Sequence, residues 1–350
     1  MKLAYIAFSD KGFALAEKLA EALGGTAYRS GQPLKVNEWT AQQLTADDRP
    51  DGIVYVGAAG IAVRAIAPFV KDKAQDPAVV VIDECAYHVI PILSGHLGGA
   101  NDLARQIASI TGSDCVITTA TDVNGIFAVD EWAKRQNCKL IEREKIVNVS
   151  SALLAGKTIT FFSRWPIEGN VPDGIELIAP AEEGDGMPGY SMEGLAVIVD
   201  LDAKAGHPLH LVPQICILGI GCRKGTTCET LNERLDLFLE ETGIHPAAIR
   251  AAATIDIKKD EPGLIEFCEM HGWPLLTYTS EELKQIPGTF TSSKFVSSVT
   301  GVDNVCERSA VAATGGKLLQ EKMAGDGVTM ALAMKAYHPN WNWRDEPADK

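Results

Sequence analysis

The sequence predicts an α/β fold: an N-terminal parallel-sheet α/β domain, a small α+β middle domain and a C-terminal α/β domain. The first observation is a buried strand at Leu3–Phe8, followed by helical spacing of apolar residues over Phe13–Leu23. The same strand-then-helix order returns at Ile53–Val56 and again, after a turn-rich middle segment, at Ile215–Ile220. Alternation of this kind favours mostly parallel sheets covered by helices.

The chain is long enough for several domains. Its 350 residues exceed the roughly 100 to 200 residues of most single domains. Strand-like runs joined by Gly- and Pro-rich turns begin near residue 142, and AGHPLHLVP (205–213) is interpreted as a linker. We therefore predict domains at residues 1–140, 141–213 and 214–340, with antiparallel edge strands flanking AGDG near the end and a frayed tail from residue 338.

Composition and charge limit the kinds of partner. The formal net charge of −14 argues against a nucleic-acid partner, because binding a polyphosphate backbone requires a basic surface. The N-terminus fits neither a signal peptide nor a membrane span, and the 8 cysteines are scattered without CxxC spacing. We expect a cytoplasmic protein with reduced thiols, no membrane contact, no metal site of its own and no organic cofactor.

The most informative motif is SGHLGGAND, residues 94–102, between a predicted strand and a predicted helix. Its glycines let the backbone approach a ligand, and N–H groups at a helix start can hold a carboxylate or a developing oxyanion. Its imidazole can exchange a proton near neutral pH, unless the histidine merely caps the turn. The candidate positions are Ser94, His96, Gly98, Gly99, Asn101 and Asp102.

Two other loops follow predicted strands of the same domain. In GAAGIAVR, Gly57, Gly60 and Arg64 could form an anion-binding nest, or they could be packing glycines and a solvated arginine. In TATD, a pair of hydroxyls and a carboxylate could face the same rim, or could cap a helix. These side chains are Thr119, Thr121 and Asp122. Loops at the carboxyl ends of parallel strands share one edge, so we expect one common rim.

The C-terminal domain carries the basic loop GIGCRKGT, residues 219–226. Its spacing is neither GxGxxG nor a Walker P-loop, so we interpret it as an anion clamp, with a plain basic turn as the alternative. The residues concerned are Gly219, Gly221, Arg223 and Lys224. Lys294 and Glu307, in a later hydroxyl-rich segment, are weaker candidates, since such segments are more often solvated surface.

Taken in order, GAAGIAVR, SGHLGGAND, TATD, GIGCRKGT, SSK and GVDNVCER make the chain similar from end to end to the CbiG family of anaerobic cobalamin biosynthesis. The C-terminal domain resembles the stand-alone CobE proteins. The resemblance implies that a cobalt-containing tetrapyrrole, cobalt-precorrin-5A, is hydrolysed at a lactone to cobalt-precorrin-5B and acetaldehyde. The cobalt would belong to the substrate, and neighbouring enzymes of that pathway are candidate partners.

For this reaction we hypothesise roles for the candidate residues. His96 would be the general base, backbone N–H groups near Gly98 and Gly99 would hold the oxyanion, and Asp102 or Asp122 would orient the histidine. Ser94 as a nucleophile is a minor variant. Substrate carboxylates would pair with the cations Arg64, Arg223, Lys224 and Lys294. The alternatives are a non-catalytic corrinoid-binding protein and a nucleotide-binding α/β enzyme.

Overall fold

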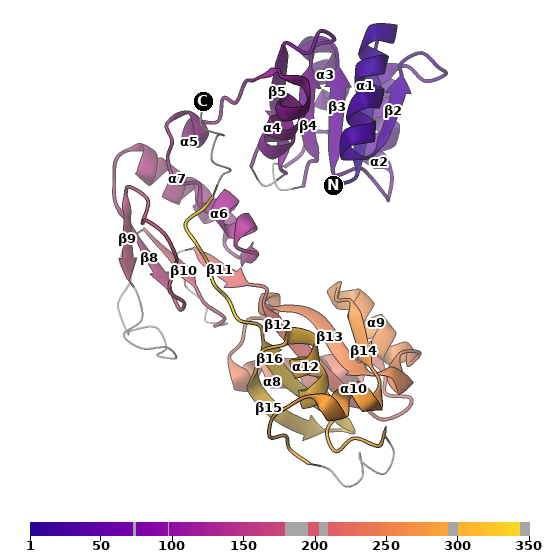
Figure 1. Ribbon diagram of the computed structural model, residues 1–350, viewed down its shortest axis with the longest axis vertical. Helices are drawn as coiled ribbons and strands as arrows, with labels where there is room; N and C mark the ends of the chain where they lie inside the picture. Colours follow the sequence, from indigo (N-terminus) through magenta and orange to yellow (C-terminus); the bar gives the residue numbers. More distant parts are fainter. Residues whose placement is uncertain (73–74, 97, 179–194, 203–208, 293–299, 344–350) are drawn as a thin grey trace. The chain divides into compact units, whose positions relative to one another are not determined.

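The computed structural model describes residues 1–72, 75–96, 98–178, 195–202, 209–292 and 300–343. The chain divides into two compact units, Met1–Glu131 and Trp132–Lys350. The first unit contains one sheet and the second contains two (Figure 1). Within the described residues, every helix is too short or too polar to cross a lipid bilayer.

The first unit is built on a six-stranded sheet in the order β2-β1-β3-β4-β5-β6. Its strands are β1 (Leu3–Ala7), β2 (Thr26–Arg29), β3 (Gly52–Val56), β4 (Ala78–Ile82), β5 (His88–Leu93) and β6 (Asp114–Cys115). Its helices are α1 (Asp10–Leu23), α2 (Val36–Thr45), α3 (Ala59–Ile66), α4 (Ala100–Thr111) and α5 (Ala120–Val123), and α6 (Val129–Arg135) leads into the second unit.

Helices cover both faces of this sheet, because successive strand residues point to opposite sides and both sides are apolar. Tyr5 and Val54 face a core completed by α1 and α4. Their neighbours Ile6 and Ile53 face a core completed by α2 and α3. The parallel-rich α/β architecture predicted from the sequence is therefore present.

The direction of β5 decides which loops meet. β5 runs antiparallel to β4, with Leu93 opposite Val79, whereas β1, β3 and β4 are mutually parallel. Only the five residues 83–87 join β4 to β5, which is too short for a parallel crossover of a dozen or more residues. β6 follows the direction of β5. Segments 94–102 and 119–122 consequently lie at one edge of the sheet and segment 57–64 at the other.

The expectation of one shared rim is therefore wrong for GAAGIAVR. Gly57 follows the end of β3 and its N–H donates to the Ile82 carbonyl at 2.8 Å, at the edge opposite to SGHLGGAND. A side chain at Gly57 would collide with the Phe8 ring, whose nearest carbon lies 2.5 Å from the Cβ position. Arg64 is exposed on α3. Gly57 and Arg64 fit the alternative of a packing glycine and a solvated arginine, whereas a Cβ atom at Gly60 would make only an ordinary contact, 3.5 Å from Arg64 Nη1.

The second unit begins with a five-stranded sheet in the order β7-β11-β10-β8-β9. Its strands are β7 (Cys138–Leu140), β8 (Ile159–Ser163), β9 (Ile175–Ile178), β10 (Ala196–Val199) and β11 (His210–Pro213), with helix α7 (Ile146–Leu154). β7 is antiparallel to β11 and the other pairings are parallel.

A further five-stranded sheet has the order β14-β13-β12-β16-β15. Its strands are β12 (Cys216–Cys222), β13 (Ile249–Ile255), β14 (Leu275–Tyr278), β15 (Lys317–Gly325) and β16 (Val328–Met334). The helices are α8 (Cys228–Thr242), α9 (Pro262–His271), α10 (Ser280–Gln285) and α12 (Cys306–Thr314). The hairpin predicted around AGDG is β15–β16, but β15 alone is the edge, because β16 also pairs with β12.

The described parts of two segments expected to be loose are packed. The predicted linker ends in β11, a fully buried strand between β7 and β10. The predicted frayed tail contains Trp341, which is 4% exposed and packs on Trp132 and Phe161 at ring-centroid distances of 5.9 and 5.0 Å. Trp341 packs against residues that are far away in the sequence, and the composition of the tail does not reveal such contacts. The three-domain division stays a prediction.

Candidate functional site

His96 lies among three carboxylates at the edge of the first sheet. Its Nε2 atom is 2.9 Å from Asp122 Oδ2, and its Nδ1 atom is 3.1 Å from Asp130 Oδ2. Glu131 Oε1 lies 3.6 Å from the same Nε2 atom. All four side chains are largely withdrawn from solvent, with side-chain exposures between 9 and 14%. The structure thus brings together the histidine of SGHLGGAND and the aspartate of TATD, with two residues that the sequence analysis missed.

Local structure explains how the loop is held. Gly98 is required because a Cβ atom there would lie 2.3 Å from the Ser94 Cβ atom, so the turn closes on itself. The Gly99 N–H donates to the His96 carbonyl at 2.9 Å, and the two following N–H groups donate to the carbonyls of Ser94 and Gly95. The N–H groups of Gly99 and the next two residues are therefore already hydrogen-bonded within the turn. The predicted oxyanion hole at Gly99 is therefore not supported.

Asp122 is held from its other side by two residues of α4. Arg105 Nη2 donates to Asp122 Oδ1 at 2.6 Å, and Asn101 Nδ2 donates to Oδ2 at 3.1 Å and to the Thr119 hydroxyl at 3.3 Å. The Thr121 hydroxyl lies 3.4 Å from His96 Nε2. Asn101, Thr119 and Thr121 therefore belong to the cluster, in the role of positioning Asp122 and His96.

Two other predicted residues have different partners. Asp102 pairs with Arg105 at 3.1 Å, so Asp122 and not Asp102 is the carboxylate against His96 Nε2. The buried Ser94 hydroxyl donates to the Asp76 carbonyl at 2.9 Å. This hydrogen bond anchors the loop and leaves the hydroxyl badly placed to act as a nucleophile.

Electrostatics govern the protonation of the cluster. Burial by itself lowers the pKa of His96, but the hydrogen bonds to Asp122 and Asp130 and the nearby carboxylates outweigh it and raise the pKa to about 10. Burial raises the pKa of Glu131 to about 7, although His96 opposes this shift. Burial also works against ionisation of Asp122, yet His96 and Arg105 hold its pKa below the usual range. With its proton in place, His96 is an imidazolium and cannot accept another, which conflicts with the predicted general-base role.

The sequence offered one overlooked signal for this cluster. Asp130 and Glu131 are adjacent acidic residues in the first turn of α6. Acidic residues at a helix start are common for dipole reasons, so the pattern alone does not distinguish a site from a stabilised terminus. Only the fold shows that this helix start faces His96.

A cavity of about 820 Å³ lies at the carboxyl ends of β12 and β13, within the second unit. Gly221, Arg223 and Lys224 of the basic loop line it, together with Lys258 and Lys322. Arg223 and Lys224 are exposed, whereas Lys258 pairs with Glu261 at 2.9 Å. The predicted anion clamp therefore opens onto a cavity of ligand size. Lys294 lies outside the described residues.

Two predicted residues of this region have internal roles. A Cβ atom at Gly219 would lie 1.8 Å from the Cys306 carbonyl oxygen, so this glycine permits close packing of β12 against α12. The buried Glu307 carboxylate accepts hydrogen bonds from Thr291 N, Thr291 Oγ1, Asn304 Nδ2 and Lys322 N at 2.7 to 2.9 Å. Its oxygens are committed to protein donors, which makes Glu307 a positioning residue for the cavity wall.

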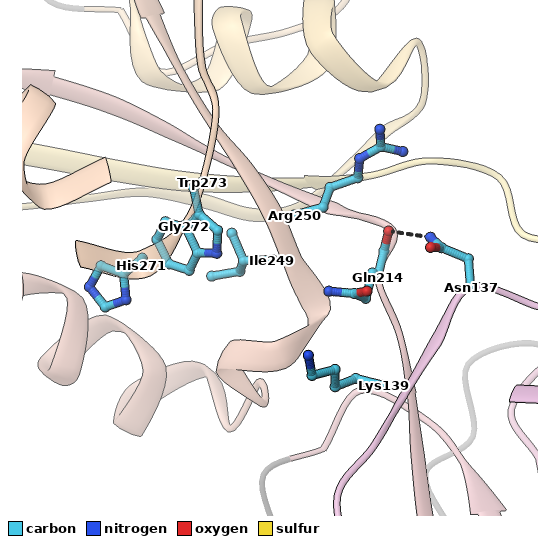
Figure 2. A pocket seen from close by; sticks show the side chains of 8 residues that line it. All are labelled: Asn137, Lys139, Gln214, Ile249, Arg250, His271, Gly272 and Trp273. Atoms are coloured by element: carbon cyan, nitrogen blue, oxygen red, sulfur yellow. Dashed lines mark hydrogen bonds between the residues drawn. The ribbon is translucent and has the colours of Figure 1, made fainter. Parts of the chain in front are cut away.

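A second, more polar hollow of about 470 Å³ lies near the start of β13 (Figure 2). Figure 2 shows Asn137 donating to the Gln214 carbonyl, a bond of 3.1 Å, with Lys139 and Arg250 nearby. His271 stacks on Trp273, with ring centroids 4.4 Å apart. The sequence analysis did not identify this hollow, because its residues come from separate segments that carry no motif. It lies at the opposite end of β13 from the basic loop.

The fold and the His96 cluster define an α/β protein with a buried acid–imidazole centre. Comparison with known proteins identifies the family to which this chain belongs. Residues 44–122 match the family model "Cobalamin synthesis G N-terminal", and residues 216–333 match "Cobalamin synthesis G C-terminus". The chain is 35% identical over 348 residues to the cobalt-precorrin-5A hydrolase of Salmonella typhimurium, covering 95% of this chain and 97% of that protein. The chain belongs to the cobalamin synthesis G (CbiG) family.

A second hydrolase agrees with this assignment, and a solved CobE structure is similar to part of the chain. The cobalt-precorrin-5A hydrolase of Priestia megaterium is 32% identical over 301 residues, which is 82% of this chain and 79% of that protein. The crystal structure of CobE, a protein from the cobalamin (vitamin B12) biosynthetic pathway, is 34% identical and covers 35% of this chain and 92% of its own, with a TM-score of 0.34. The resemblance to CbiG that the ordered motifs indicated is confirmed.

Proposed function

We propose that this protein is a cobalt-precorrin-5A hydrolase, which opens the lactone of its substrate and releases acetaldehyde to give cobalt-precorrin-5B. The observation that carries the proposal is the 35% identity to the Salmonella enzyme, which spans 97% of that enzyme. The match extends over the parts of this chain that carry the His96 cluster and the second-unit cavity, and is not confined to one domain.

The two sites suit different parts of this task. Lactone hydrolysis bonds a water oxygen to the carbonyl carbon, breaks the ring C–O bond and transfers a proton to the departing oxygen. The protonated His96 can donate a proton, and a neighbouring carboxylate such as Glu131, whose burial raises its pKa to about 7, can accept one. A corrinoid carries several peripheral carboxylates, and the cations Arg223, Lys224 and Lys322 at the second-unit cavity offer charge-assisted hydrogen bonds to them.

Turnover by the purified full chain tests the proposal. We expect one acetaldehyde to be released for each cobalt-precorrin-5A consumed, with the product mass of cobalt-precorrin-5B. Asp122→Asn should reduce turnover at least tenfold, because Asp122 contacts His96 at 2.9 Å. The matched control is His88→Ala, since His88 is exposed and its aspartate partner is 3.7 Å away.

Two outcomes would count against this function, and a third against the role of the His96 cluster in it. Binding of the corrinoid without acetaldehyde release, in an assay where the Salmonella enzyme is active, would favour a non-catalytic corrinoid-binding protein. Saturable nucleotide binding without turnover would favour the nucleotide-binding alternative, which the family match does not support. Full activity of Asp122→Asn would remove the His96 cluster from the reaction. The cobalt corrinoid as substrate and a cytoplasmic location are parts of the same proposal.

A further inference from the structure

Three side chains around His96 have the spacing of metal ligands. His96 Nε2, Asp122 Oδ2 and Glu131 Oε1 all lie within 4.8 Å of one another. The two distances from Nε2 are 2.9 Å to Asp122 and 3.6 Å to Glu131. Ligand atoms around a tetrahedral Zn²⁺ ion are about 3.3 Å apart, because each bond is about 2.0 Å long. The two distances from Nε2 lie on either side of this value.

Glu131 supplies an independent indication of a missing cation. The residue is only 7% exposed, and its carboxylate points at His96 Nε2 from 3.6 Å. Among the residues that the structure describes, no hydrogen bond to this carboxylate is present, and Nε2 is closer to Asp122. Buried carboxylates are normally hydrogen-bonded or bound to a metal. A bound ion would give this carboxylate a closer partner than His96 Nε2 at 3.6 Å.

The surroundings match the outer shell of a metal site. Metal-bound histidines usually donate their second ring N–H to a carboxylate, which fixes the ring and its tautomer. His96 has such a partner, since Asp130 Oδ2 lies 3.1 Å from Nδ1. Arg105 donates to Asp122 Oδ1 at 2.6 Å, whereas Oδ2 faces His96 and also accepts a hydrogen bond from Asn101 Nδ2 at 3.1 Å. His96 and Asp122 are thus each oriented by a residue that is not itself a proposed ligand.

The charge balance also favours a cation. The carboxylates of Asp102, Asp122, Asp130 and Glu131 lie in this cluster with Arg105 and His96. Three of these carboxylates lie within 3.6 Å of the single His96 imidazole. A divalent ion in place of the Nε2 proton would offset this negative charge and use the imidazole in its neutral, ligating form.

We propose that His96, Asp122 and Glu131 bind one divalent transition-metal ion, with Zn²⁺ as the reference ion, and leave a coordination position open to water. One imidazole and two carboxylates suit Zn²⁺ and its neighbours better than a soft, thiolate-preferring ion. The sequence analysis expected no metal site, because the three ligands are separated by up to 35 positions and form no motif. Binding of the ion is independent of the proposed activity. Its use to activate a water against the lactone rests on that activity.

Metal titration of the full-length chain tests the site. The protein is stripped with a chelator and titrated with Zn²⁺ by calorimetry and with Co²⁺ by visible absorption. We expect one equivalent to bind, with cobalt bands of low coordination number and without sulfur-to-cobalt charge-transfer absorption. Glu131→Gln and Asp122→Asn should weaken binding at least tenfold, and Asp130→Asn by roughly 10- to 100-fold through the outer shell. The control His88→Ala changes a histidine that has one aspartate at 3.7 Å, and should bind like the unmodified protein.

Several results would overturn the proposal. They are no binding by the stripped chain, a charge-transfer band that places the ion on a cysteine, or unchanged affinity in a Glu131→Gln variant whose circular dichroism shows it to be folded. If that variant does not fold, the stoichiometry and spectrum of the unmodified chain decide. Failure of the two proposals can be told apart. An ion that binds as expected to a chain without turnover refutes the activity alone, whereas turnover by a metal-free chain that binds no ion refutes the metal site alone.

Discussion

The buried Glu307 carboxylate offers a sharp test of how the cavity wall is held. It joins the loop at Thr291, the residue Asn304 before α12 and Lys322 of β15 through four hydrogen bonds. In Glu307→Gln, the amide keeps one acceptor oxygen and replaces the other with an NH₂ group. If the oxygen stays beside Thr291 N and Asn304, the NH₂ group faces the Lys322 N–H, so that two donors oppose each other.

The expected cost follows from these contacts. A buried donor without an acceptor costs about 1 to 3 kcal/mol, and loss of the negative charge weakens the bonds that remain by about 1 kcal/mol. We therefore expect local opening to become easier by about 3 kcal/mol, which corresponds to a roughly 150-fold larger opening constant. Asn304 and Lys322 line the cavity, so binding of anionic ligands there should also weaken.

Hydrogen exchange of the full chain, read by peptide mass spectrometry over residues 304–325, measures this change. The matched control is Glu321→Gln, because Glu321 is exposed on the same strand. Faster exchange confined to Glu307→Gln would agree with the proposed role. An increase of less than tenfold in the opening constant would show that Glu307 does not hold these three segments together.

Two further predictions concern packing. Gly219→Ala places a Cβ atom 1.8 Å from the Cys306 carbonyl oxygen, so we expect a loss of about 3 kcal/mol in stability, seen as a lower urea midpoint for the surrounding sheet; an unchanged midpoint would mean that α12 can move away freely. Ending the chain at Tyr337 removes Trp341, whose burial is worth about 4 kcal/mol for an aromatic side chain of this size. Exchange protection of β8 should fall accordingly, and unchanged protection would show that the tail contributes nothing to that core.

Much of the first sheet could be predicted because its information is local. Val79 and its neighbours in β4 are apolar on both faces, which marks a buried strand, and Ser9 accepts a hydrogen bond from the Gly12 N–H at the start of α1. The direction of β5 could also have been inferred. Five residues between β4 and β5 exclude a parallel crossover, so the misplaced rim came from applying the parallel-sheet rule too widely.

The His96 cluster shows the opposite case. The sequence marked His96 and Asp122 as residues that can carry chemistry, because each sits in a polar loop after a strand. It could not show that Asp130 and Glu131 face them, nor that the Gly99 N–H is already committed to the His96 carbonyl. Those facts depend on how α6 and the loop pack.

The amino-acid sequence by itself determined the alternation of strands and helices, the acidic character of the chain and, through the order of its motifs, its family. These features depend on residue type, spacing and order, which are visible along the chain. Only the tertiary structure decided which loops share an edge, which carboxylates surround His96 and which hydrogen-bonding groups are already occupied. Such facts depend on strand direction and on contacts between distant segments, and a pKa or a metal affinity is the sum of those contacts over a few ångströms.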